Sequence, residues 1–210
     1  MKILKIDINQ ISKEDIELIV DYLNKGKVVA YPSDTVYGLG CRSDNLKAIK
    51  KVFKIKKREK NTPVLLLVKS YCMLKKYVRV NKEQDKYLKN KIWTEENKNN
   101  PISVLLAGRG LLLKDYLEKD NAVAIRMPIK NVGLPKNDFL IKLIKEIDVP
   151  LVSTSLNVVG QKPISDLENL NKYFKKDKPD LVIDIGKEKT KKSSQLIDIK
   201  NINNIKILRK

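Results

Sequence analysis

Short apolar stretches alternate with amphipathic helical patterns along this chain, and that alternation restricts its fold more than any other feature. Residues 64–68, Val-Leu-Leu-Leu-Val, form a near-continuous apolar run of the length expected for a strand in a sheet buried on both faces. We therefore expect an α/β protein with a mixed twisted sheet and helices on its faces. The other predicted strands lie at 27–31, 102–107, 122–127, 149–154, 181–185, 195–199 and 205–208.

Helical periodicity occupies the intervals between these strands. Ser12 is expected to cap a helix that ends at Gly26, because serine is a favoured first cap and glycine a favoured stop. Asp44 is expected to cap a second helix, whose apolar positions lie near Ile49 and Val52. Further helices are predicted at 82–91, at 138–147 and from Ser165 onward, the last with Glu168 as its capping-box partner.

Length and residue usage bound the class of protein. A chain of 210 residues suits one domain, 1–210. No apolar run approaches the roughly 18 residues of a membrane span, and the N-terminus has no secretory hydrophobic segment. Cys41 and Cys72 form no close pair. We expect a cytoplasmic protein with reduced thiols and no membrane partner.

The chain contains no histidine, and this excludes several mechanisms. A Ser-His-Asp triad, a Cys-His pair and a histidine metal ligand are all impossible. Two cysteines cannot build a structural zinc site, and we predict no metal-ligating residues. Catalysis would have to use lysine, arginine, hydroxyl groups, amides, carboxylates and the backbone, a set better suited to binding and polarising an anion than to relaying protons.

The net charge of +19 points to phosphate-bearing or polyanionic ligands. Lysine supplies most of that charge and asparagine is abundant, as in proteins from AT-rich genomes, so genome composition is an alternative explanation for part of the excess. The arginines are more informative, because a guanidinium grips phosphate or carboxylate with a fixed fork. There are six: Arg42, Arg58, Arg79, Arg109, Arg126 and Arg209.

Three segments carry candidate chemistry, and each has an ordinary structural explanation. Residues 31–40, YPSDTVYGLG, suit a small polar ligand approached by backbone, although a glycine turn with an Asx cap is commoner. Residues 54–63 suit a phosphate clamp in which Lys56 and Arg58 point into a cleft, although most basic runs are solvated surface. Residues 150–160, PLVSTSLNVVG, end a strand in hydroxyl and amide groups, which suits either a cleft mouth or strand-end capping.

Taken together and in order, these segments resemble the YrdC-like family, the threonylcarbamoyl-AMP synthases, over nearly the whole chain. The family pattern Y-P-T-D/E-T-V-Y-G-L-G corresponds to YPSDTVYGLG, and P-L-x-x-x-S-A-N-x-S-G corresponds to PLVSTSLNVVG. The K-x-R motif corresponds to residues 56–58, the P-L-I/V strand that follows it to 63–65, and the A-V-R-x-P strand to 124–128. The D-x-G segment corresponds to 184–186, the S-T-I-V-D segment to 194–198, and the L-R ending to 208–209.

The resemblance implies a YrdC/RibB-like fold around a basic concave cavity, and a short form without the extra C-terminal domain of longer members. It implies an enzyme, a nucleotidyltransferase that condenses L-threonine, bicarbonate or CO2, and ATP into threonylcarbamoyl-adenylate and pyrophosphate. ATP is then a substrate, with Mg2+ expected to accompany it. Downstream transfer proteins would move the product onto adenosine 37 of tRNAs that read codons beginning with A, and tRNA is a possible partner.

Site residues follow from the resemblance position by position. Lys56, Arg58, Ser155 and Asn157 are the expected catalytic group. Threonine would be held by Thr35, Arg126, Ser155 and Ser194. The nucleotide would be held by Lys56, Arg58, Thr62, the backbone at Ala122, Asn157, Ser165 and Arg209.

The chain departs from the family pattern at several positions. The substituted residues are Ser33 for Thr, Glu59 for Pro, Leu156 for Ala, Val159 for Ser and Leu67 where many members have a ligand-contacting His. The family segment W-P-G-P-L-T is reduced to Trp93, a polar stretch and residues 100–103. Two other functions fit the sequence: a non-catalytic double-stranded RNA or tRNA binding module, and a relative that acts on another carbamoyl-adenylate.

Overall fold

The computed structural model describes residues 1–59, 62, 64–111, 114–117, 120–130, 133–164, 166–168, 170–174, 176–187 and 192–210. Its strands are β1 (Lys2–Lys5), β2 (Val29–Tyr31), β3 (Gly38–Arg42), β4 (Leu65–Leu67), β5 (Ile102–Ala107), β6 (Ala122–Arg126), β7 (Leu151–Ser155), β8 (Leu181–Asp184), β9 (Gln195–Asp198) and β10 (Lys206–Arg209). Its α-helices are α1 (Lys13–Asn24), α2 (Leu46–Lys56), α3 (Tyr71–Tyr77), α4 (Lys82–Tyr87), α5 (Lys114–Leu117), α6 (Pro135–Ile147) and α7 (Leu170–Tyr173).

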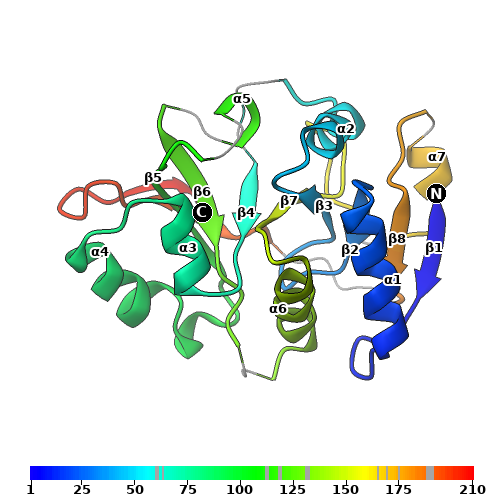
Figure 1. Ribbon diagram of the computed structural model, residues 1–210, viewed down its shortest axis with the longest axis horizontal. Coiled ribbons are helices and arrows are strands. Elements are labelled where there is room, and N and C mark those ends of the chain that lie inside the picture. The colour runs from blue at the N-terminus through cyan, green and yellow to red at the C-terminus, as the bar shows by residue number, and fades with distance from the viewer. Residues whose placement is uncertain are drawn as a thin grey trace.

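All ten strands join one sheet in the order β1-β8-β2-β3-β7-β4-β6-β5-β9-β10. The sheet is mixed: β1 with β8 and β4 with β6 are parallel pairs, whereas β3 with β7 and β5 with β6 are antiparallel pairs. Figure 1 shows α2 and α5 at the top of the view and α6 at the bottom, with the sheet between them. The predicted α/β class with a mixed sheet and covering helices is confirmed.

Local sequence explains most of these elements. The Ser12 side chain accepts a hydrogen bond from the Asp15 backbone N–H and caps α1, as predicted. The strand at 64–68 is confirmed, and Val64, Leu66, Leu67 and Val68 are buried in the core. Leu67, the departure from the family's histidine, is fully buried.

The prediction for the cap of α2 was wrong by one residue. Asn45 is the N-cap, and its side chain accepts a hydrogen bond from the backbone N–H of Ala48. Asp44 instead forms an ion pair with Arg42, with Nη2 and Oδ2 separated by 2.7 Å. The carboxylate of Asp44 is therefore paired with the nearby guanidinium and does not cap the helix.

The sequence prediction also missed β1, β3 and α3. Strand β3 contains Gly38 and Gly40, residues that weaken strand propensity. Both are needed for close packing: a Cβ on Gly40 would lie 1.9 Å from the Val152 carbonyl oxygen, and one on Gly38 would lie 2.6 Å from the Tyr31 ring. Tertiary packing thus makes a strand where local propensity favours a turn.

The helix predicted from Ser165 is only partly testable, because Ser165 lies outside the described residues. Helix α7 begins at Leu170, and Leu167, Leu170 and Phe174 are buried as the periodicity predicted. The predicted helix at 82–91 is α-helical only to Tyr87 and continues as a π-helical turn over Leu88–Ile92. Polar residues 95–97 form a 3-10 turn.

Candidate functional site

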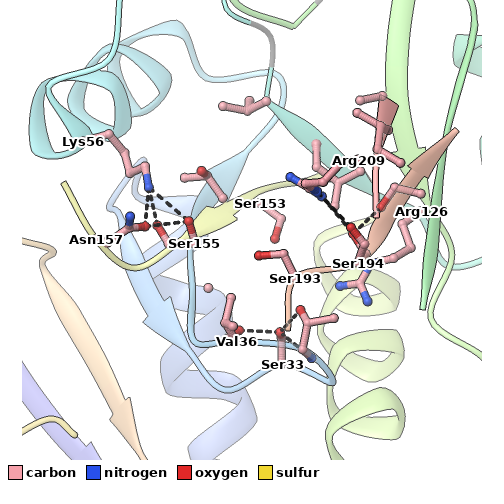
Figure 2. Close-up of a pocket in the computed structure, with 18 of the residues that line it drawn as sticks. Ser33, Val36, Lys56, Arg126, Ser153, Ser155, Asn157, Ser193, Ser194 and Arg209 are labelled. Carbon is pink, nitrogen blue, oxygen red and sulfur yellow. Dashed lines mark hydrogen bonds between the residues drawn. The ribbon is translucent and has the colours of Figure 1, made fainter. Parts of the chain in front are cut away.

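One cavity of about 340 Å³ lies where β7, β6, β10 and the C-terminal end of α2 meet. Figure 2 shows Lys56, Ser155 and Asn157 on one side, Arg126, Ser194 and Arg209 on the other, and Ser33 and Val36 along the lower edge. The described lining includes four cationic side chains and no carboxylate. It also carries eight hydroxyl groups, from Ser33, Thr35, Ser103, Ser153, Thr154, Ser155, Ser193 and Ser194.

Lys56 ends α2 and is only 2 % exposed. Its ammonium donates to the Ser155 carbonyl at 2.6 Å, to Asn157 Oδ1 at 2.7 Å and to Ser155 Oγ at 3.2 Å. These acceptors are neutral, so no counter-charge offsets the loss of hydration. Burial, followed by the nearby Arg58 charge, lowers the pKa of Lys56 to about 7.

The chain turns sharply after Lys56, and this turn brings Arg58 to the cavity. Lys57 adopts a left-handed conformation with φ of 49°, and the Arg58 backbone N–H donates to the Phe53 carbonyl at 2.9 Å. The Arg58 Nε donates to the Thr62 carbonyl at 2.8 Å. Burial first, and then the Arg209 charge, lower the pKa of Arg58.

Arg126 ends β6 and is 2 % exposed. Its Nη1 donates to both carboxylate oxygens of Asp34, which lies in the loop between β2 and β3. Both side chains of this ion pair are almost completely buried. Arg126 is therefore a charge-compensated cation, unlike Lys56.

A chain of hydrogen bonds places Arg209 beside Arg126. Ser103 Oγ and Ser194 Oγ are 2.7 Å apart, both buried. Arg209 donates from Nη2 to Ser194 Oγ at 3.2 Å and from Nε to the Ser194 carbonyl at 2.9 Å. Burial first, and then the Arg126 charge, lower the pKa of Arg209.

The loop between β2 and β3 forms the edge of the cavity through a serine turn. Ser33 Oγ donates to the Val36 carbonyl at 2.5 Å and lies 3.0 Å from Thr35 Oγ1. The Thr35 backbone N–H donates to Ser33 Oγ at 3.2 Å. Serine at position 33 thus holds Thr35 at the cavity wall with its own hydroxyl group.

The described residues contain no group of three or more cysteine or acidic side chains able to hold a metal ion. The cavity lining itself offers hydroxyl, amide and cationic groups. This donor set suits anionic ligands and not a divalent cation, which prefers carboxylate oxygens. Among the described helices, none combines the length and apolarity that crossing a membrane requires.

Comparison with known proteins gives the family. The family model Sua5/yciO/yrdC, described as "Telomere recombination", matches residues 21–210. The chain belongs to this family. The YrdC-like resemblance read from the motifs is confirmed.

Curated relatives within the Sua5/YciO/YrdC family carry one activity in their names. A Methanocaldococcus jannaschii protein, provisionally named threonylcarbamoyl-AMP synthase, is 32 % identical over 95 % of this chain and 88 % of its own length. The Neisseria meningitidis threonylcarbamoyl-AMP synthase is 29 % identical over 84 % of this chain and 87 % of its own length. The Pyrococcus abyssi enzyme is 25 % identical over 90 % of this chain, which spans 52 % of that relative.

Solved structures of the family support the fold. Pyrococcus abyssi Sua5 complexed with L-threonine has a TM-score of 0.78 at 24 % identity, covering 94 % of this chain and 54 % of that structure. Escherichia coli YciO has a TM-score of 0.79 at 21 % identity, covering all of this chain and 94 % of that structure. At these identities the likeness establishes the fold alone.

Most of the residues selected from the family motifs lie around the one cavity. Lys56, Arg58, Ser155, Asn157, Thr35, Arg126, Ser194 and Arg209 all line it. Thr62 and Ala122 are outside the lining, although Thr62 contacts Arg58 and Ala124 on the same strand as Ala122 does line the cavity. Ser165 lies outside the described residues. The roles assigned to these residues remain predictions.

Sequence reasoning missed several lining groups. Ser103, Ser153, Thr154 and Ser193 face the cavity, and Ser103 belongs to the hydrogen-bond chain that holds Arg209. Ser153 and Thr154 lie within the motif PLVSTSLNVVG, and Ser153 could have been suggested because alternation along a strand places it on the same face as Ser155. Ser103 gave no such indication: its strand was predicted at 102–107, but no motif marked its hydroxyl group as a site residue.

Proposed function

We propose that this protein is a threonylcarbamoyl-AMP synthase, which makes threonylcarbamoyl-adenylate from L-threonine, bicarbonate or CO2, and ATP. One observation carries the proposal: four cationic side chains surround a hydroxyl-rich cavity whose described lining contains no carboxylate. The charge of Arg58 contributes to lowering the pKa of Lys56, the charge of Arg209 does the same to Arg58, and the charge of Arg126 does the same to Arg209. Burying like charges together is unfavourable unless an anion relieves the repulsion. A triphosphate and an amino-acid carboxylate would supply the anions.

The chemistry suits a site without histidine. The threonine amine adds to CO2, loses a proton and becomes a carbamate. A carbamate oxygen then attacks the α-phosphorus of ATP, a new P–O bond forms, and the bond to the β-phosphate oxygen breaks to release pyrophosphate. Negative charge develops on phosphate oxygens, so catalysis needs positioning and fixed positive charge.

The two ends of the cavity suit the two substrates. Lys56 and Arg58 would bind the phosphates, with Ser155 and Asn157 fixed beside them by direct hydrogen bonds to Lys56. Thr35, Arg126 and Ser194 would hold threonine, since a guanidinium pairs well with a carboxylate. Arg209 would lie between the two ligands because the charge effects link it to both Arg58 and Arg126.

Mg2+ would reach this site through the ATP phosphates, where it would neutralise charge on the triphosphate. The lining offers it no carboxylate. We further propose that the product serves tRNA modification, in which partner proteins transfer the threonylcarbamoyl group to adenosine 37. The protein itself would act before that transfer step.

Incubation with ATP, Mg2+, bicarbonate and L-threonine tests the function. We expect a product with the mass of threonylcarbamoyl-adenylate and one pyrophosphate per product, both lost when threonine or bicarbonate is omitted. L-valine should be a poor substrate, because a buried partner of the threonine hydroxyl would be left unpaired. Tight, salt-sensitive RNA binding without threonine-dependent pyrophosphate release would instead favour an RNA-binding module.

A further inference from the structure

Asp34 contacts Arg126 from behind the cavity wall. Asp34 does not line the cavity that holds Arg126, Lys56 and Arg58. It meets Arg126 at a separate void of about 10 Å³, bordered also by Trp93 and Asn137. A void of that size holds about one water molecule at most. Of the two cavities that Arg126 lines among the described residues, the one of about 340 Å³ is large enough for an amino acid.

The ion pair uses only part of the guanidinium. Within the described part of the chain, Nη1 alone has a hydrogen-bond partner, and the buried Nε has none. An unpaired guanidinium N–H in a buried site is costly, and the remaining donors are a ready receptor for a planar anion. The pair thus fixes the guanidinium while leaving donors available.

We propose that Asp34 is a positioning residue, which holds the Arg126 guanidinium so that its remaining donors receive the carboxylate of the amino-acid substrate. This inference rests on the proposed function, because it takes that substrate to be L-threonine. Immobilising a long side chain opposes ligand binding. Asp34 makes that immobilisation part of folding, so the carboxylate meets an arginine that is already oriented.

The charges near Arg126 also match a ligand with a single carboxylate. Arg126 and Arg209 influence each other as like charges, and Asp34 cancels one of them at contact distance. About one net positive charge remains at this end of the cavity, which suits a carboxylate better than a phosphate dianion.

Steady-state kinetics of Asp34→Ala test the proposal, because the KM for threonine and the KM for ATP should respond differently. The KM for threonine should rise roughly tenfold to a hundredfold, the range for losing hydrogen bonds to a charged group. The KM for ATP and kcat should change less than about threefold, because the Lys56 end does not depend on Asp34. Asp44→Asn is the matched control: it breaks an arginine–aspartate pair outside the cavity lining and should leave all three constants unchanged.

Asp34→Glu guards against misfolding, since it keeps the buried charge but moves the carboxylate by one methylene. It should fold, as measured by thermal unfolding, and raise the threonine KM by less than Asp34→Ala does. Unchanged threonine KM in a folded Asp34→Ala protein, or equal effects on both substrates, would overturn the positioning role. Absence of threonine-dependent turnover in the wild type would instead refute the proposed function, and calorimetric binding of L-threonine to wild type and variants would still test the role of Asp34 directly.

Discussion

The two ends of the cavity bury positive charge in different ways. At one end Lys56 is surrounded by neutral oxygen atoms of Ser155 and Asn157, and at the other Arg126 is paired with the carboxylate of Asp34. Desolvation lowers the pKa of Lys56 to about 7, so its charge depends on what binds there. Arg126 is held in place by its ion pair with Asp34. The difference indicates that the charge at the Lys56 end responds to the ligand, whereas the guanidinium at the Arg126 end is oriented before any ligand binds; we call the latter the fixed end.

The largest effect should come from removing charge at the Lys56 end of the cavity, where we propose that phosphate binds. Arg58→Ala is expected to lower threonine-dependent pyrophosphate release by roughly 100-fold or more, the scale for losing one donor to developing charge. Arg79→Ala is the matched control, because Arg79 is exposed and lies outside the cavity lining. Near-wild-type pyrophosphate release by Arg58→Ala would remove Arg58 from the catalytic group.

Sequence patterns predicted this end of the cavity well, because its parts are local. Lys56 and Arg58 are two residues apart at a helix end, and Ser155 and Asn157 share one strand end. The Arg126 end depends on contacts that no local pattern encodes. Asp34 and Arg126 are 92 residues apart in sequence, and Ser103 and Ser194 are 91 apart. Their pairing results from the strand order of the sheet.

The fold shows the same division between local and long-range causes. Apolar periodicity predicted β4, β5 and β6 nearly to their ends because each strand is buried. It could not predict β3, where Gly40 is required by the approach of the Val152 carbonyl from the neighbouring strand. Asn45 and Asp44 are both good helix caps; in the structure Asp44 is engaged by Arg42, and Asn45 caps the helix.

A pH series sharpens the comparison, because only the Lys56 end should take up a proton when its ligand binds. A triphosphate favours the charged form of Lys56 and raises its pKa from the ligand-free value of about 7. As pH rises above 7, more of the ligand-free protein has lost that proton, so the apparent affinity for ATP should fall by up to about tenfold per pH unit. Titration calorimetry at pH 7.5 to 9 (roughly the range in which ATP itself no longer titrates) measures both affinity and proton uptake.

Lys56→Met provides the control for the pH series. Its ATP binding should be weak and nearly independent of pH between about 7.5 and 9. Ligand-free wild type should gain stability relative to Lys56→Met as pH rises from about 7 toward 10.5, because the unfolded chain then binds the proton that the folded chain has released. Equal pH dependence of ATP binding in the two proteins would show that Lys56 is already fully charged in the free cavity.

The smallest expected effect tests how the fixed end is built. Ser103 is fully buried and contributes one hydroxyl to the chain that runs through Ser194 to Arg209. Ser103→Ala removes one neutral hydrogen bond, so we expect a loss of about 1 kcal/mol in the free energy of unfolding and a roughly threefold rise in the KM for threonine. The KM for ATP should not change. Ser43→Ala, at a buried serine outside the cavity lining, should leave both KM values unchanged. If Ser103→Ala changed the ATP KM as much as the threonine KM, the two ends would be coupled through Arg209, and the Arg126 end could not be treated as independent of the Lys56 end.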